Sequence, residues 1–344
     1  MTMRSWKTLF LITLACGILA GCDKPAQTGL GGQIRFRAAS GSMDTRTAYS
    51  GDTGTEDGVT KERINWIEGD QVTVWSDKAV YLGDASRRTA DYKIKNVTTS
   101  GVRSIAELVA TDANGFQWGD EAAGTTYTFY ARYPADQTKI NGTNMTAEIP
   151  ATQTLLYDSE SGKISPDMKY AFMFASTTAP IHADAVKLEF DPEFTALEFV
   201  VGGGGNGQVN LTSFKLSSTS VPVSGGFQVV CASKAATATG TAANSVSMDF
   251  SNLPGGKLTV TGDTPVTVTV FAVPVELKNL TLEVTGDKIQ TRTLKLNNKN
   301  GSTITFAGGR KYRITGLNLP ELLNVNGKDI DWDIEALLEP MVWD

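Results

Sequence analysis

The sequence predicts an all-β protein, and three observations support this prediction. Alternating runs rich in Thr, Val, Tyr and Phe recur from residue 34 to residue 319. Gly, Asn, Asp and Pro interrupt these runs at short intervals, and no segment keeps the helical period of about 3.6 residues. Many short strands separated by turns are typical of β-sandwiches. The clearest runs are IRFRA, QVTVW, TYTFYARY, VKLEF, ALEFVV, KLTVTG, VTVTVFAVPV, NLTLEVTG and RKYRITGLNL.

The chain begins with a segment typical of a secretory signal. Two basic residues precede a short apolar run that ends in Leu19-Ala20-Gly21-Cys22, and this run is too brief to span a bilayer. The four residues resemble the bacterial lipobox, in which the cysteine receives a lipid and starts the mature chain. The alternative is an ordinary cleavage site that contains a cysteine. We expect a signal peptide at residues 1–21, lipid on Cys22 and a flexible tether at residues 22–33.

Cysteine usage and charge narrow the class of protein. Cys16 leaves with the signal and Cys22 carries lipid, so Cys231 alone remains and the folded part has no internal disulfide. We expect Cys231 to be a small apolar filler on a strand. The net charge of -6 and the lack of a basic stripe argue against nucleic-acid binding.

Two folded domains are expected. The stretch ISPDMKYAFMFASTTAPIHADA looks irregular, because Pro166 and Pro180 would each interrupt a ladder of strand hydrogen bonds. A new series of strands then begins at Val186. We therefore expect an N-terminal domain at residues 34–183, a C-terminal domain at residues 184–319 and a separate tail at residues 320–344.

No motif indicates catalysis, a cofactor or a metal. The glycine run 202–207 fits a dinucleotide-binding spacing, but a strand follows it, which favours a glycine-rich hairpin loop. Asp329, Asp331 and Asp333 match the start of an EF-hand loop, but its later Gly and Glu are missing. The single histidine, His182, is not accompanied by a nucleophile elbow. We predict a protein that is not an enzyme and binds no cofactor.

Tryptophans leave a carbohydrate-binding alternative open, since flat aromatic side chains stack on sugar rings. Trp66 and Trp75 lie within alternating strands, which is typical of core residues. Trp118 is flanked by turn residues. We therefore expect Trp118 to be exposed, and it is our candidate for a glycan contact.

Several segments, in order along the chain, carry a family resemblance. Residues 46–77 contain Arg-Thr-x-Tyr, a polar loop and then Ile-x-Trp-x-x-Gly-Asp-x-Val-x-Val. Together with the lipobox, these segments resemble the fimbrillin-type lipoproteins of Bacteroidetes, the subunits of type V pili. The other segments are IPATQT (149–154), DMKYAFMFA (167–175), FTALEFVV (194–201) and FAGGRKYRITGLNL (306–319).

The resemblance implies a fold and a route of assembly. It implies two transthyretin-like β-sandwich domains in tandem, exported as a lipoprotein to the cell outer membrane and assembled into an extracellular fimbrium that contributes to cell adhesion. It also implies that an arginine- or lysine-specific protease removes the first strand, and that the C-terminal strand of another subunit fills the groove. The partners would be copies of this chain or related subunits.

These implications select residues at the start of the chain. The first strand would be Ile34–Ala38, with Ile34 and Phe36 facing inward. Arg46 is the preferred cleavage site, because a protease needs an extended, mobile segment. Arg37 and Arg35 are alternatives, and both lie inside the expected strand.

The tail has the alternation of a strand. From Asp329 to Glu335 the pattern would place Ile330, Trp332 and Ile334 on one face and four carboxylates on the other. This segment would be the donor strand. Its alternative is an edge strand that packs permanently on its own C-terminal domain. The corresponding functions are a polymerising fimbrial subunit and a non-polymerising, glycan-binding outer-membrane lipoprotein.

Overall fold

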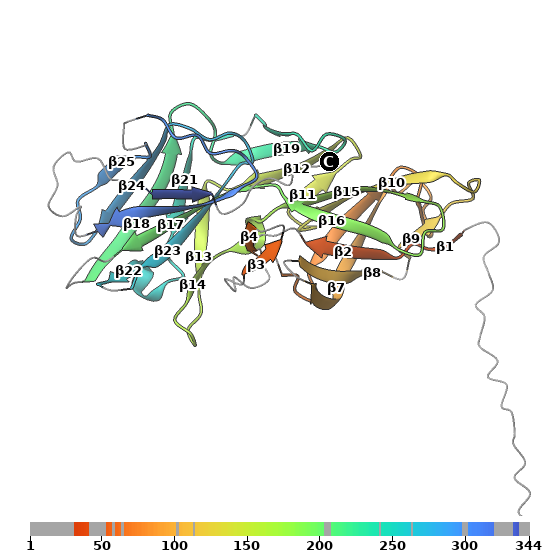
Figure 1. The fold of residues 1–344 in the computed structure, drawn as a ribbon, viewed down its shortest axis with the longest axis horizontal. Helices are drawn as coiled ribbons and strands as arrows, with labels where there is room; N and C mark the ends of the chain where they lie inside the picture. The colour runs from red at the N-terminus through yellow and green to blue at the C-terminus, as the bar shows by residue number, and fades with distance from the viewer. Residues whose placement is uncertain are drawn as a thin grey trace, which may run out of the picture.

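A computed structural model shows an elongated molecule built of β-sheets, with a barrel at one end and a sandwich at the other (Figure 1). The structure describes residues 31–40, 53–56, 59–62, 65–100, 103–112, 114–202, 208–240, 242–262, 264–297, 302–319 and 333–336, of which 53–56, 59–62 and 333–336 are described by backbone alone. The predicted all-β class is confirmed. Two short 3₁₀ turns, η1 (Met168–Tyr170) and η2 (Pro254–Gly256), occur among these residues.

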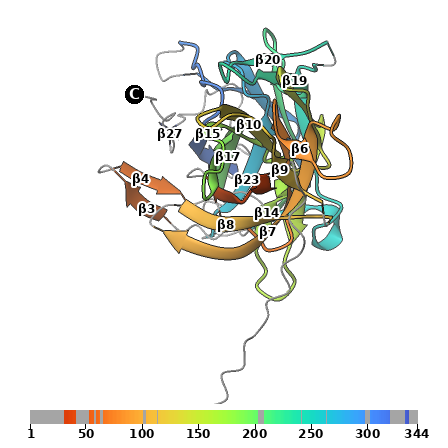
Figure 2. The same cartoon turned by 90° about the vertical axis from the view of Figure 1, so that its right-hand side faces the viewer.

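The first unit is a closed barrel. Neighbouring strands are antiparallel except β16 and β2, which run parallel. Figure 2 faces this end of the molecule and shows β7 and β8 as one curved wall. In bonded order the strands are β10 (Thr126–Tyr133), β15 (Met173–Pro180), β16 (Val186–Pro192), β2 (Phe36–Ser40), β8 (Arg103–Ala110), β7 (Thr89–Ser100) and β5 (Gln71–Ser76).

A small sheet accompanies the barrel. It consists of β1 (Gly31–Gln33), β9 (Phe116–Trp118) and β6 (Val80–Tyr81), in that order. The rings of Trp118 and Phe129 lie 6.1 Å apart, edge to face, so this sheet packs against strand β10 of the barrel. A separate hairpin pairs β3 (Thr53–Glu56) with β4 (Val59–Glu62).

The second unit is a β-sandwich. Phe199 of one sheet meets Phe214 of the other edge to face, with ring centroids 5.4 Å apart. One sheet contains β23 (Val266–Ala272), β17 (Thr195–Gly202), β26 (Lys311–Asn318) and β27 (Asp333–Ala336). The other contains β14 (Ile164–Pro166), β13 (Thr152–Tyr157), β21 (Ser245–Asp249), β18 (Gln208–Ser218), β24 (Leu280–Gly286) and β25 (Arg292–Lys295), with β22 (Leu258–Thr261) paired to β18.

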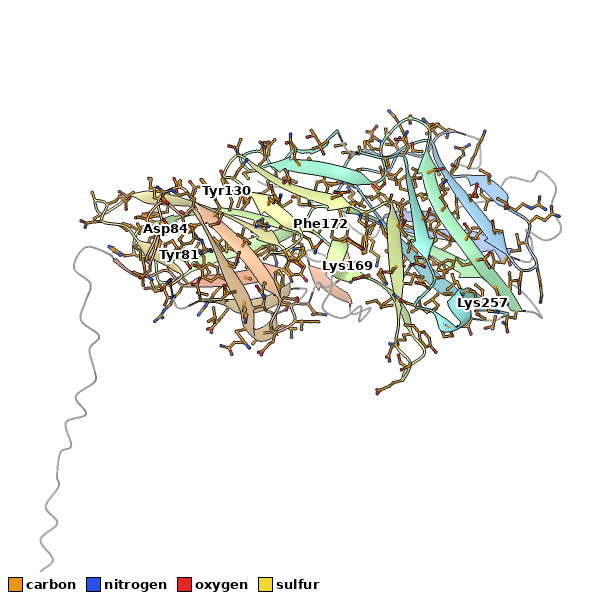
Figure 3. The ribbon with its side chains drawn as sticks, turned by 180° about the vertical axis from the view of Figure 1, so that it is seen from behind. Tyr81, Asp84, Tyr130, Lys169, Phe172 and Lys257 are labelled. Carbon is orange, nitrogen blue, oxygen red and sulfur yellow. The ribbon has the colours of Figure 1, made fainter. Side chains whose placement is uncertain are left out.

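A further sheet joins the two halves of the chain. Its order is β11 (Thr138–Ile140), β12 (Asn144–Ile149), β19 (Gly225–Val230) and β20 (Ala236–Ala238). Phe172, labelled in Figure 3, lies where the units meet and packs against Phe227 of β19 at 5.7 Å. The buried side chains of both units form one connected core.

The boundary that we expected near Ala183 is wrong. Strand β16 begins at Val186 but pairs with β2 and β15, so it belongs to the barrel. Strand β13, from the first half of the chain, pairs instead with β21 in the sandwich. The units therefore exchange strands, and no single cut in the sequence separates them.

The stretch with two prolines is also more regular than expected. Pro166 is the last residue of β14, and Pro180 is the last residue of β15. Proline is tolerated at these positions because each strand ends there. At the start of the chain, residues 31–33 form β1 rather than the end of the tether.

The strand predicted after the glycine run is confirmed as β18. It pairs in a different sheet from β17, so the connection joins the two sheets of the sandwich. The expected hairpin loop is therefore wrong.

Candidate assembly site at the two terminal strands

Strand β2 is hydrogen-bonded to a neighbouring strand on each side within the closed barrel. It runs parallel to β16, with Phe36 opposite Val186, and antiparallel to β8, with Phe36 opposite Leu108. The chain entering β2 is fixed too, since Ile34 N donates to Phe116 O at 2.9 Å. Removal of β2 would leave two unpaired strand edges one strand apart.

The inner face of β2 is buried in an aromatic core. Ile34 and Phe36 are each 2% exposed, which confirms the predicted inward face. The Phe36 ring meets Tyr92 at 5.1 Å and Phe129 at 5.3 Å, both edge to face. This geometry is favourable for aromatic pairs. At the end of β2, Ser40 Oγ accepts a hydrogen bond from Ser104 N at 3.0 Å.

The outer face of β2 carries the two alternative cleavage residues. Arg35 and Arg37 are exposed, on either side of Phe36. Arg37 lies opposite Lys187 on β16 and opposite Glu107 on β8. The preferred cleavage residue Arg46 and the lipidation residue Cys22 lie outside the described residues.

Trp118 does not have the exposure that a glycan contact needs. It is 4% exposed, and its ring packs against Tyr127 at 5.0 Å and against His182 at 6.2 Å. Our expectation of an exposed Trp118 is therefore wrong. The turn residues on either side of Trp118 suggested exposure, but Trp118 lies in the short strand β9 against the barrel, opposite Gly31 of β1.

The C-terminal strand β27 lies at the edge of the sandwich. Within the described residues it pairs with β26 alone, antiparallel, with Ile334 opposite Ile314. Of the expected donor residues, Ile334 is thus placed by its backbone, while Ile330 and Trp332 lie outside the described residues. This pairing corresponds to the self-closing alternative for the tail. It involves one ladder, whereas β2 has two.

An ion network that we did not predict joins β17 to β26. Glu198 is 0% exposed and pairs through Oε2 with Lys311 Nζ at 2.9 Å and through Oε1 with Arg313 Nε at 2.7 Å. Arg313 lies opposite Glu335 of β27. No local pattern predicts this network, because a glutamate in the alternating run ALEFVV is expected to face outward.

A second group of charges lies where the barrel strand β16 leads into the sandwich strand β17. Lys234 Nζ forms an ion pair with Asp191 and donates a hydrogen bond to its Oδ2 at 2.8 Å. Burial raises the pKa of Asp191, although Lys234 opposes this shift. Burial also raises the pKa of Glu193 from 4.5 to about 8, and the nearby charge of Asp191 adds to the shift.

Metal-ligating residues and the remaining cysteine were predicted to have no chemical role. In the described part of the chain, His, Cys, Asp and Glu residues form no cluster of three or more that could hold a metal ion. Cys231 is a buried, free thiol, as expected of a small filler, but it lies in the turn after β19 and not on a strand. Burial raises its pKa to about 11. In the same described residues, no helix has the length and apolar character needed to cross a membrane.

Comparison with known proteins decides the family. A profile of the Fimbrillin-like family matches residues 47–329. The chain belongs to the Fimbrillin-like family. This match confirms the resemblance seen in the sequence. No curated protein matches the chain.

Three crystal structures of similar proteins each match most of this chain. A proposed cell adhesion protein of Bacteroides ovatus is 12% identical, with a TM-score of 0.51, and the match covers 90% of this chain and 98% of that one. A proposed cell adhesion protein of Bacteroides uniformis is 13% identical (TM-score 0.48, 89% and 98% covered). A fimbrial assembly protein of Parabacteroides distasonis is 11% identical (TM-score 0.42, 88% and 96% covered). At 12% identity, the first likeness shows the fold alone.

Proposed function

We propose that this chain is a structural, non-enzymatic subunit of a surface fimbrium, and that it polymerises when its N-terminal strand is replaced by the C-terminal strand of another copy. The observation that carries the proposal is the position of β2 between β16 and β8. A groove between two unpaired edges, backed by Tyr92 and Phe129, is unfavourable in water. An incoming strand restores the ladder hydrogen bonds and buries apolar side chains together.

Cleavage at Arg46 fits this function better than cleavage at Arg37 or Arg35. A cut after Arg46 would separate all of β1 and β2 from the rest of the chain. Arg37 lies within a strand that is bonded on both sides, so its backbone is not available in the extended form that a protease binds. Arg35 adjoins the same ladder, since its carbonyl oxygen accepts from Val186 N at 2.8 Å.

The same proposal includes surface anchoring through Cys22. The precursor would be held at the outer membrane by lipid on Cys22, and cleavage would free the subunit for assembly. The glycan-binding alternative has lost its candidate residue, because Trp118 is buried.

The test uses purified precursor and an arginine-specific protease. Trimming at Arg46 is expected to convert monomers into polymers, measured by gel filtration and electron microscopy. Arg46→Gln should resist trimming and stay monomeric, and deletion of residues 320–344 should allow trimming but prevent polymerisation. If the trimmed, full-length chain remains monomeric, the proposal is wrong.

A further inference from the structure

The leading strand has a burial pattern that can be compared with the tail. From Ile34 to Ser40 the side chains are buried, exposed, buried, exposed, and then buried at three successive positions. Alternation places Ala39 on the same face as Arg37, but Ala39 is 1% exposed. Any strand that replaces β2 therefore needs side chains that can be buried at five positions, of which four are apolar in β2 and the last is Ser40, and it tolerates charge at only two.

One segment of the tail reproduces this pattern. Residues 332–338 read Trp-Asp-Ile-Glu-Ala-Leu-Leu, which is apolar, acidic, apolar, acidic and then three times apolar. Every other seven-residue window of residues 320–344 puts a charged or polar residue at a buried position or an apolar residue at an exposed one. The match also keeps alanine at the position of Ala38.

We infer that residues 332–338 of another copy take the place of residues 34–40 in the same direction, parallel to β16 and antiparallel to β8. This inference rests on the proposed function and specifies its register. Ile334 would then occupy the space of Phe36, between the rings of Tyr92 and Phe129. Leu337 would occupy the place of Ala39.

The competing register is shifted by two residues. It would place Ile330 at position 34 and Trp332 in the aromatic space of Phe36. However, it would also place Glu335 at the buried position of Ala39, opposite Glu189. The carboxylate of Glu189 is already paired with Lys187 at 2.5 Å and with Arg103 at 3.6 Å. Burying a second carboxylate there costs more than an aromatic contact gains.

Charges on the outer face do not decide between the registers. In β2, Arg37 lies opposite the like charge of Lys187 and the unlike charge of Glu107. Either register replaces Arg37 by an acid, which reverses both relations and leaves their sum similar. The inference therefore rests on the buried positions.

Aspartate substitutions in the tail of the trimmed subunit separate the two registers. Leu337→Asp should reduce polymer yield at least about tenfold, because it buries a charge in the place of Ala39. Ile330→Asp should leave the yield within about twofold, because residue 330 falls beyond the matched segment. The opposite result, loss with Ile330→Asp and assembly with Leu337→Asp, would overturn the inferred register and support the shifted one.

Ile334→Asp tests the proposed function separately, since residue 334 faces inward in both registers. Normal polymerisation of this variant would show that the tail is not the donor strand. Its loss together with normal behaviour of Ile330→Asp supports both the function and the register.

Cysteine pairs give a readout that does not depend on loss of assembly. The inferred register places residue 335 of one copy opposite Glu107 of the next, because Arg37 has that position in β2. Glu107→Cys with Glu335→Cys should therefore form a ladder of oxidised multimers on non-reducing gels. The matched pair Glu107→Cys with Asp333→Cys should form none. A ladder only from the Asp333→Cys pair, or from neither pair in intact polymers, would overturn the register.

Discussion

The strands β2 and β27 differ in how the rest of the molecule holds them. β2 is bonded to β16 and β8, and its inner side chains lie in the barrel core. β27 has four residues, and in the part of the chain that the structure describes it is an edge strand with a single ladder to β26. An edge strand can leave without opening a gap in its sheet, whereas a central strand cannot. The difference explains why a replaceable N-terminal strand would need proteolysis and a donated C-terminal strand would not.

The barrel strand beside β2 continues directly along the chain into the sandwich strand beside β26. β16 flanks β2, β17 flanks β26, and Glu193 lies in the short link between β16 and β17. A change at this link can therefore reach both regions. Substitutions in each region test whether β2 and β27 are held as differently as their pairing indicates.

The largest effect is expected in β2. Phe36→Ala removes a ring that contacts Tyr92 and Phe129, and should lower the free energy of unfolding of the precursor by about 4 kcal/mol. Urea denaturation followed by tryptophan fluorescence measures it. The matched control is the exposed neighbour Arg37→Ala, which should change stability by no more than about 0.5 kcal/mol. Equal effects of the two variants would mean that β2 is not held by its inner face.

The next effect concerns the sheet that carries β27. Glu198→Ala leaves Lys311, which is 3% exposed, without its buried carboxylate, and should cost about 3 kcal/mol. The control is the double variant Glu198→Leu with Lys311→Met, which removes both charges and should recover most of the loss. If the single variant is as stable as the parent in thermal unfolding, the network does not stabilise β26.

Sequence reasoning predicted best what depends on neighbours along the chain. Alternation correctly placed Ile34 and Phe36 inward, because both faces of a strand are encoded within a few residues. It could not show that β16 lies beside β2, since residues 36 and 186 are far apart in sequence and parallel pairing leaves no local turn signal. The burial of Trp118, which we expected to be exposed, and of Glu198, for which we made no prediction, has a related cause. In both cases the covering residues come from distant segments that no local pattern reveals.

A pH dependence is expected at the link between the two regions. Burial raises the pKa of Glu193 to about 8 from 4.5, so the folded protein keeps a proton that the unfolded chain loses. The contribution of Glu193 to the free energy of unfolding is therefore fully present below about pH 4.5. It falls as pH rises towards 8 and is constant above that. Glu193→Gln should remove this dependence and make the protein more stable by about 2 to 3 kcal/mol at pH 7.

Urea midpoints at pH 5 and pH 8 measure the effect of Glu193. The difference in urea midpoint between Glu193→Gln and the parent should grow with pH over this range. Glu276→Gln, whose side chain is 62% exposed in the parent, is the matched control and should show no such growth. A constant difference would mean that Glu193 is ionised in the folded protein, with its charge balanced locally.

The smallest effect is expected in β27, and it bears most directly on the choice between a donated and a self-closing tail. Hydrogen exchange of the untrimmed precursor should show the amides of β2 opening only with global unfolding, and those of β27 opening by local fraying. Deletion of residues 333–344 should accordingly cost no more than about 1 kcal/mol. Phe36→Ala provides the comparison, because it should speed exchange in β2 without changing exchange in β27. If the amides of β27 are protected as strongly as those of β2, the tail closes its own sandwich, because a strand held by the full stability of the fold is not free to join another subunit.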